Sequence, residues 1–237
     1  MERLAGTDEL LDGPLDDLDE LADNLRDMRR ANRLLGGARL SRLALARLVD
    51  GRIGDGPLTM VDVGSGGVDI PMALMADAAR KGRALAVTAI DVRPEVLEAA
   101  RRARPAIDRV PGLELVAADG RTLPYADEAF HVAHTSMVVH HLDPRGAVDL
   151  LREMSRVARD GVVVNDLIRG RHAFAWAWLF TRATTRNRLT RHDAPLSVRR
   201  AYSRDELLDL VEDAGLRVVA DIGGIVGHRR AIAAVRR

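Results

Sequence analysis

From residue 58 onward, short apolar segments alternate with amphipathic helical segments, and this alternation restricts the fold more than any other feature. The apolar segments are nearly continuous, which is typical of strands that are buried on both faces of a parallel sheet. Such a chain predicts an α/β fold with a doubly wound, mostly parallel sheet. We expect seven strands, over residues 58–63, 84–91, 113–119, 130–139, 161–168, 217–223 and 229–237.

Helical periodicity accounts for most of the segments between these strands. Pro94 falls in a first turn, where its missing N–H costs nothing. Ser203 is followed three residues later by Glu206, which is the pattern of a capping box. We expect connecting helices over residues 69–82, 93–104, 143–158 and 203–216.

The residues before the first strand are predicted to form a helical extension or cap. Leucines and a methionine recur there at helical spacing, and Gly36 and Gly37 separate two helices, over residues 15–34 and 38–50. We therefore expect an extension over residues 1–50 and a ligand-binding domain over 51–237.

Composition narrows the class of protein. The net charge is +1 and there is no cysteine, which argues against a general nucleic-acid binder and excludes disulfides and thiolate metal sites. The acidic start does not resemble a signal peptide, and no apolar run approaches the ~18 residues that span a membrane. We expect a cytoplasmic protein, either monomer or homodimer.

The segment VDVGSGGVDI, residues 61–70, places a glycine-rich turn directly after a strand. A dinucleotide fingerprint needs G-x-G-x-x-G, but here Gly64 and Gly66 are followed by Asp69 at the third position. An acid at that helix N-terminus would repel a pyrophosphate. The turn therefore predicts a ligand without phosphate that approaches the backbone closely, and it disfavours a nicotinamide-dependent oxidoreductase.

Four blocks in order resemble the class I methyltransferases that depend on S-adenosylmethionine (SAM). The blocks are VDVGSGGVDIP, AIDVRPEVLEAAR, the segment over residues 116–142 and RAYSRDELLDLVEDAGLRVV, and the resemblance covers residues 58–235. It implies SAM as cofactor, with Asp91 on the ribose hydroxyls and Asp119 at the adenine amino group. Taken singly, each motif has a plain structural explanation: a tight turn, a helix cap or an Asp-Gly turn.

One departure is Ser65-Gly66-Gly67, where the family often has a sequence such as Cys-Gly-Thr-Gly. Arg30 and Asn32, from the segment RRANRLLGG, are further candidates for the methionine end of the cofactor, with a solvated helix face as the alternative. The predicted cofactor-binding residues are Asp62, Gly64, Ser65, Gly66, Asp91, Val92, Asp119, Gly120, Thr135, Asn32 and Arg30.

Methyl transfer to a hydroxyl needs alignment of the two partners and removal of a proton, for which histidine is the usual base. His140 and His141 follow the fourth strand, and Asp166 lies near the end of the fifth. Neighbouring parallel strands bring these positions to one edge, so we predict all three as catalytic residues. His134, in mid-strand, is expected to be buried and hydrogen-bonded. No spacing of His, Asp or Glu predicts a metal site.

Residues 169–202 form an insert that we interpret as a lid over the acceptor. It holds both tryptophans and eight arginines against a single acid. An aromatic lid favours a flat apolar acceptor such as a phenol or a polyketide-like aromatic. Asp16, Asp17, Asp19 and Glu20 of the extension are hypothesised to neutralise the lid arginines. The predicted substrate-binding residues are Trp176, Trp178, Phe180 and His172.

Several alternatives stay open for this insert. Its aromatic residues could be ordinary packing between lid helices. AFAWAWLF, flanked by arginines, could instead rest on a membrane interface and give access to a quinone or lipid acceptor. Binding of RNA through the arginines is disfavoured, because no N/D-P-P-Y acceptor motif is present.

The sequence hypothesis is therefore a SAM-dependent methyltransferase of a small molecule, most simply an O-methyltransferase of an aromatic or polyketide-like hydroxyl. One alternative is C- or O-methylation of a quinone-like or lipid-like acceptor at a membrane surface. The other is a non-catalytic SAM-binding protein.

Overall fold

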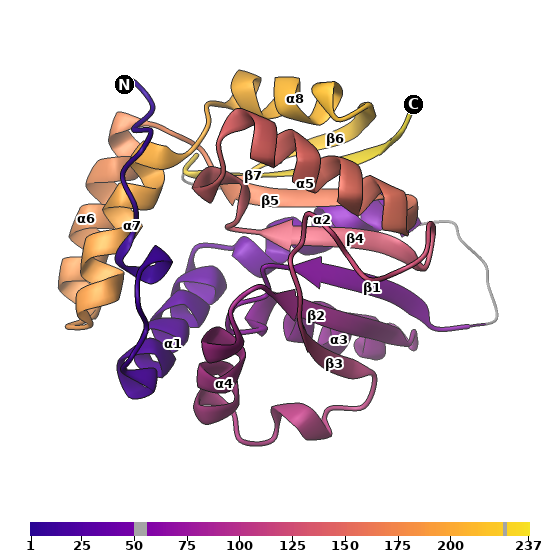
Figure 1. Ribbon diagram of the computed structural model, residues 1–237, viewed down its shortest axis with the longest axis horizontal. Coiled ribbons are helices and arrows are strands. Elements are labelled where there is room, and N and C mark those ends of the chain that lie inside the picture. The colour runs from indigo at the N-terminus through magenta and orange to yellow at the C-terminus, as the bar shows by residue number, and fades with distance from the viewer. Residues whose placement is uncertain (50–55, 225–226) are drawn as a thin grey trace.

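The computed structural model describes residues 1–49, 56–224 and 227–237. Its centre is a seven-stranded sheet with the order β3-β2-β1-β4-β5-β7-β6 (Figure 1). Strands β1 to β5 are parallel, and β7 runs antiparallel to both β5 and β6. The strands are β1 Leu58–Val63, β2 Leu85–Asp91, β3 Leu113–Ala117, β4 Phe130–Ser136, β5 Ala158–Leu167, β6 Leu216–Gly223 and β7 Arg229–Arg236.

The predicted fold class is confirmed, because the sheet is doubly wound, has seven strands and is mostly parallel. Its helices include all those expected, and the insert folds into two further helices, α6 and α7. The α-helices of the described residues are α1 Leu18–Leu34, α2 Gly37–Val49, α3 Asp69–Arg80, α4 Pro94–Ala103, α5 Pro144–Val157, α6 Arg171–Thr184, α7 Arg188–Arg200 and α8 Arg204–Asp213.

Helices cover both faces of the sheet. On one face, α5 and α8 pack against Val61, Ala133 and Val162, which point to that side of three neighbouring strands. On the other face, α2 and α3 pack against Met60 and Val132 (Figure 1). Residues adjacent in one strand thus point into different layers, which explains why each strand is apolar along its length.

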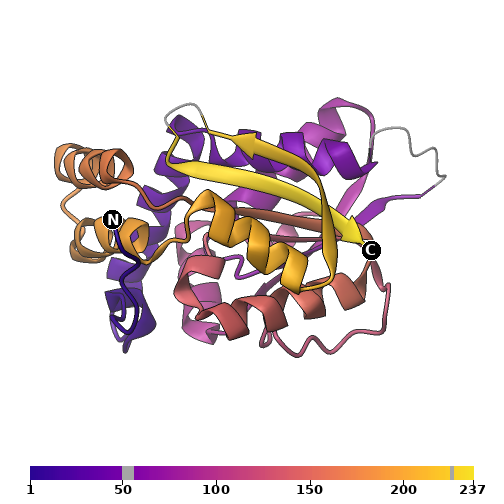
Figure 2. The ribbon, with the colours of Figure 1, turned by 90° about the horizontal axis from the view of Figure 1, so that it is seen from above.

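Helices α1, α6 and α7 gather at one end of the molecule, beyond the carboxyl ends of the parallel strands (Figures 1 and 2). The first residues of the chain run along α7, where the backbone N–H of Leu4 donates to the carbonyl of Arg199. A short 3-10 helix, η1 Leu10–Asp12, interrupts this segment. The ligand-facing edge of the sheet is therefore covered by the N-terminal residues and by the insert.

One difference from the predicted strands lies at the end of β4. β4 ends at Ser136, Met137 has a φ of 63°, and the chain then enters the 3-10 helix η3 Val139–His141. The expected strand over residues 130–139 is therefore wrong at its last three positions. Val139 is fully buried in the core, so an apolar pattern continued past the point where the backbone left the sheet.

Two further predictions concern the domain boundary and membrane-spanning helices. The boundary expected between residues 50 and 51 lies outside them. In the described part of the chain, no helix has the length and apolar character needed to cross a membrane.

Candidate active site

The glycine turn after β1 is tightly packed against the end of β4. Gly64 and Gly66 have positive φ values of 69° and 51°, a region that favours glycine. A Cβ on Gly64 would lie 2.2 Å from a methyl carbon of Val138. Leu25 of α1 packs over the other side of the turn, close to Gly67. Any side chain at Gly64 would therefore displace the residues that follow β4.

Asp91 ends β2 beside this turn. Its carboxylate accepts hydrogen bonds from the backbone N–H groups of Gly66, at 3.0 Å, and Arg93, at 3.1 Å. Burial raises the pKa of this carboxyl, although the two backbone donors oppose the shift. A carboxylate has about four acceptor positions, so two remain for a diol. The acid and the glycines thus lie together and fit the ribose end of a nucleoside cofactor.

The other predicted cofactor residues are dispersed around the edge. Ser65 donates to Asp62, Thr135 donates to the carbonyl of Val63, and Val92 is 61% exposed. A Cβ on Gly120 would meet Val63 at 2.2 Å.

Asp119 pairs with the guanidinium of Arg121 at 2.9 Å, and this bond lowers the pKa of Asp119. Asn32 donates to Asp69 at 3.0 Å, whereas Arg30 is exposed and contacts Asp27 and the carbonyl of Thr184. All of these assignments stay predictions.

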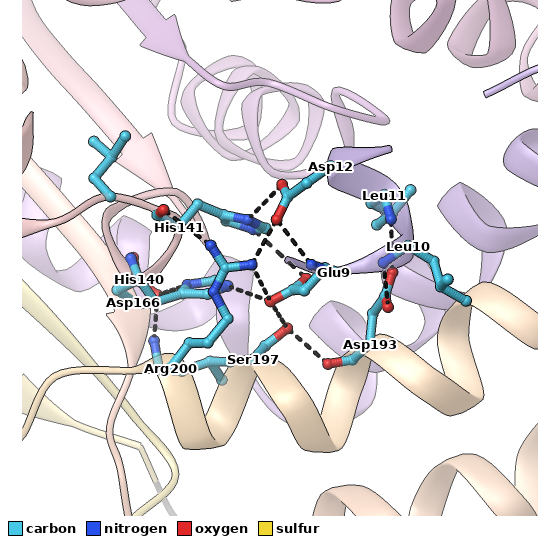
Figure 3. A network of polar contacts seen from close by, with 12 residues as sticks. Glu9, Leu10, Leu11, Asp12, His140, His141, Asp166, Asp193, Ser197 and Arg200 are labelled. Carbon is cyan, nitrogen blue, oxygen red and sulfur yellow. Dashed lines mark hydrogen bonds and ion pairs between the residues drawn. The ribbon is translucent and has the colours of Figure 1, made fainter. Parts of the chain in front are cut away.

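The three predicted catalytic residues meet in one buried network, which we call the His140 cluster (Figure 3). His140 Nδ1 lies 2.6 Å from Asp166 Oδ1, and both side chains are almost fully buried. His140 Nε2 has no hydrogen-bond partner within the described residues. The cluster comprises Glu9, Asp12, His140, His141, Asp166 and Arg200.

Glu9 was not predicted from the sequence, because it is 131 residues from His140 and no motif marks it. Its Oε1 lies 3.9 Å from His140 Nε2, and Ser197 of α7 donates to the same oxygen at 2.8 Å. Burial raises the pKa of Glu9 to about 7, with His141 and Ser197 opposing. This carboxyl can therefore exchange a proton near neutral pH.

Asp12 and Arg200 complete the cluster on the side of η1. Burial alone would raise the pKa of Asp12, but hydrogen bonds from His141 and Arg200 hold it well below its usual range. Burial likewise opposes ionisation of Asp166, and the neighbouring His140 more than offsets it, so the pKa of Asp166 is lowered. The cluster thus combines two stable carboxylates with one that is easily protonated.

Glu9, His140 and His141 place one potential ligand atom each within 4.8 Å of the others, a geometry compatible with a metal ion. The spacing of these residues in the sequence did not predict a metal site. Arg200 Nη1 lies 3.7 Å from Glu9 Oε1 and already supplies positive charge there. We assign no metal to this group.

His134 is fully buried and hydrogen-bonded, as predicted. His134 belongs to a series of hydrogen-bonded polar side chains that connects β1, β4, α2, β5 and β7. His134 Nδ1 contacts Asp62, and its Nε2 lies 2.8 Å from Ser41 Oγ. Asn165 Nδ2 donates to Ser41 at 2.6 Å, and Arg229 Nε donates to Asn165 Oδ1 at 2.6 Å. The glycine turn is thereby connected to Arg229.

A cavity of about 220 Å³ lies between α1, α6 and the ends of β5 and β7, and we call it the α1–α6 cavity. Of the predicted substrate-binding residues, Trp176 and Phe180 line it. Trp178 is 45% exposed and stacks under the guanidinium of Arg182 instead, and His172 is exposed at the start of α6. Arg30 and Asn32 also line the cavity.

A second cavity, of about 440 Å³, lies at the opposite edge of the sheet, where Leu58 and Leu85 begin their strands. Ligands of doubly wound sheets bind at the carboxyl ends of the strands. The α1–α6 cavity lies at that end of the strands and is therefore a candidate ligand site, although it is smaller than the cavity near Leu58 and Leu85.

Of the acidic residues in the extension that were hypothesised to neutralise the lid arginines, some form ion pairs with the insert and others do not. Glu20 pairs with Arg188 at 3.1 Å, as hypothesised. Asp19 pairs with Arg102 of α4 instead, and Asp17 caps α1.

Comparison with known proteins agrees with this fold. Residues 61–164 match the family model described as a methyltransferase domain. No curated protein matches the sequence. Among solved structures, a SAM-dependent methyltransferase from Aquifex aeolicus is similar, with 19% identity and a TM-score of 0.61 over 90% of this chain and 97% of that one.

Two further structures show the range of chemistry on this fold. Mitomycin 7-O-methyltransferase MmcR is 24% identical, with a TM-score of 0.58 over 83% of this chain and 54% of that one, so this chain spans about half of its length. The [4+2]-cyclase SpnF is 16% identical, with a TM-score of 0.59 over 84% of this chain and 80% of that one. At such identities the likeness establishes the fold, and the reaction must be argued from the site.

The comparisons agree with the resemblance to the class I SAM-dependent methyltransferases: the chain has the fold of the similar structures, and residues 61–164 match the methyltransferase domain model. Both findings support S-adenosylmethionine as the cofactor.

Proposed function

We propose that this protein transfers a methyl group from SAM to a hydroxyl of a small aromatic or polyketide-like molecule. The bound cofactor would supply an activated methyl group. Gly64, Gly66 and Asp91 would hold its nucleoside end, because they combine close backbone approach with a buried acceptor of hydrogen bonds.

One observation carries the assignment to oxygen: His140 is buried, is oriented by Asp166 at 2.6 Å, and keeps its Nε2 without a hydrogen-bond partner in the described structure. An imidazole whose Nδ1 donates to a carboxylate can present the lone pair of Nε2 to a proton. Asp166 would hold the ring in position and stabilise the imidazolium that forms. Glu9, on the far side of Nε2, is a second group able to take up a proton near neutral pH.

The first test is calorimetric titration with S-adenosylhomocysteine (SAH), with NADH as control, on the wild type and on Asp91→Ala. We expect binding of SAH only, weakened by the substitution. The second test is turnover with a panel of phenols and quinols, followed as a mass gain of one methyl group. Tight SAH binding with no methylation of any acceptor would favour the alternative of a non-catalytic SAM-binding protein.

An exposed apolar face of α6 supports a second candidate, methylation of a quinone-like or lipid-like acceptor at a membrane surface. Trp176, Trp178 and Leu179 are 59%, 45% and 54% exposed, and Arg182 stacks on Trp178. Tryptophan beside arginine is typical of helices that lie in a lipid interface. Flotation with anionic vesicles tests this: the wild type should float and Trp178→Glu/Leu179→Glu should not. A wild type that stays with the soluble fraction contradicts it.

A further inference from the structure

Arg229, the first residue of β7, is a buried cation in an unusual setting. Its side chain is 4% exposed, and it lines the α1–α6 cavity. Its three hydrogen bonds go to neutral oxygens: Nε to Asn165, Nη1 to Asn32 and Nη2 to Ser136. Within the described residues, no carboxylate forms an ion pair with it. The guanidinium is therefore buried without a direct counter-charge.

This setting is costly, because a buried charge is usually paired. Burial lowers the pKa of Arg229 to about 10, with Asp166 and Asp69 opposing from a distance. A guanidinium has five N–H donors, and the three hydrogen bonds of Arg229 use three of them. One N–H on each terminal nitrogen remains, and two such donors are the number that a carboxylate binds in bidentate fashion.

His228, the preceding residue, provides an independent observation. It lines the same cavity, is 9% exposed, and its Nδ1 has no hydrogen-bond partner among the described residues. Burial, with Arg229 adding to it, lowers the pKa of His228 to about 4, so the ring is neutral at physiological pH. A buried polar atom without a partner is rare, and at a cavity wall it indicates a missing ligand atom.

The remaining wall of the cavity is largely apolar, with Met137, Leu167, Ala173, Trp176 and Phe180 among its residues. We propose that Arg229 and His228 anchor a carboxylate group of a ligand whose flat apolar body occupies the α1–α6 cavity. This inference rests on the proposed function and adds the ligand's charge to it. The carboxylate belongs either to the acceptor or to the amino-acid end of the cofactor.

Binding experiments on the full chain distinguish these two sources. The first probe pair is 6-hydroxy-2-naphthoate and its neutral analogue 6-hydroxy-2-naphthamide. The second is SAH and its decarboxylated analogue. For the pair that carries the anchored carboxylate, we expect the wild type to bind the acid about 10- to 100-fold more tightly than the neutral analogue, as for hydrogen bonds between charged groups.

Arg229→Lys keeps the charge and loses the fork, so it should remove most of this preference. If the variant weakens binding of the naphthoate only, the anchored carboxylate belongs to the acceptor. If it weakens binding of SAH only, the anchored carboxylate belongs to the cofactor. Acids that bind no better than their neutral analogues, or a preference that survives Arg229→Lys, overturn the proposal. Arg230→Gln is the matched control, because Arg230 pairs with Asp221 instead.

A second variant leaves Arg229 itself in place. A Cβ on Gly37 would lie 2.8 Å from Arg229 Nη1 and 2.6 Å from Asn32 Oδ1, so Gly37→Ala should shift the guanidinium and reduce the preference about 2- to 10-fold. Gly56→Ala meets no atom within 4 Å and should change nothing. Unchanged preference in Gly37→Ala, in a protein whose circular dichroism is native, also counts against the proposal. These assays need no turnover, so their failure is separable from failure of methyl transfer.

Discussion

Two buried polar groups face the same edge of the sheet, and they are built in opposite ways. The His140 cluster holds three carboxylates beside two imidazoles and one guanidinium, so charge of both signs is present and several groups can exchange protons. Around Arg229 the partners are two amides and a hydroxyl, which neither titrate nor carry charge. The first arrangement suits proton transfer, and the second suits a fixed anion.

Substitution of His140 should give the largest difference between the His140 cluster and the surroundings of Arg229. His140→Gln removes the proposed base and should lower kcat by about 10²- to 10⁴-fold, while the affinity for 6-hydroxy-2-naphthoate changes little. Arg229→Lys should do the reverse and act mainly on the affinity. Steady-state kinetics and calorimetry on both variants test this division. His131→Gln, at the amino end of β4, serves as the control, and equal effects of the two variants on kcat would remove the distinction.

Glu9 of the His140 cluster should make stability fall as pH rises, whereas His228, whose pKa is lowered, should make it rise over a similar range. The pKa of Glu9 is about 7 in the folded protein against an ordinary value of 4.5, so the unfolded chain loses this proton first as pH rises. The Glu9 contribution is complete below pH 4.5 and is lost by about pH 7, which amounts to about 3 kcal/mol at ~1.4 kcal/mol per pKa unit.

Urea unfolding between pH 4.5 and 7.5 measures that slope. Glu9→Gln should remove the falling contribution of Glu9 and so make the slope of stability against pH more positive, and Glu212→Gln, which removes an exposed pair with Arg237, should leave the slope unchanged. Asp12, whose pKa is lowered, stabilises above its ordinary value and loses this contribution only in more acidic solution, so it does not mask the effect. An unchanged slope in Glu9→Gln would contradict the raised pKa.

The glycine turn between the two groups offers a steric test. Gly64→Ala should destabilise the protein by about 2–4 kcal/mol, from a positive φ and from overpacking against Val138. Gly215→Ala has a φ of 82° but open space around it, so it should cost only about 1–2 kcal/mol. Chemical unfolding of both variants gives the difference. Equal losses would mean that Val138 yields without cost.

The smallest expected effect separates the two tryptophans. Trp176→Ala removes a cavity wall and should weaken 6-hydroxy-2-naphthoate by about 5- to 10-fold, as for the loss of one aromatic contact. Trp178→Ala, which removes a stack with Arg182, should stay within about 2-fold. Fluorescence titration reports both, and the reverse order would place the ligand on the outer face of α6.

Much of the fold followed from the sequence because parallel strands and their helices carry strong local patterns. The approach of His140 to Asp166 also followed, since both lie at the ends of neighbouring parallel strands. The boundary of β4 did not, because Val138 and Val139 are apolar for reasons of packing outside the sheet. Apolar character marks burial, and it does not by itself mark a strand.

The residues that sequence reasoning missed share one property. Glu9 is 131 positions from His140 in the sequence, and Arg229 is 197 positions from Asn32. Neither belongs to a motif with fixed spacing, and Arg229 stands in a run of strand residues like any exposed cation. Only tertiary packing reveals that these two charges are buried.

The chain of hydrogen bonds from Asp62 through His134, Ser41 and Asn165 has a thermodynamic consequence. One end of this series of hydrogen bonds lies at the glycine turn, and the other end holds Arg229. The two proposed binding positions are therefore connected through the same buried side chains. If occupancy of the turn changes the affinity at Arg229 by some factor, occupancy at Arg229 must change the affinity at the turn by that same factor. Methyl donor and carboxylate probe, titrated each in the presence of the other, would then report a single coupling free energy.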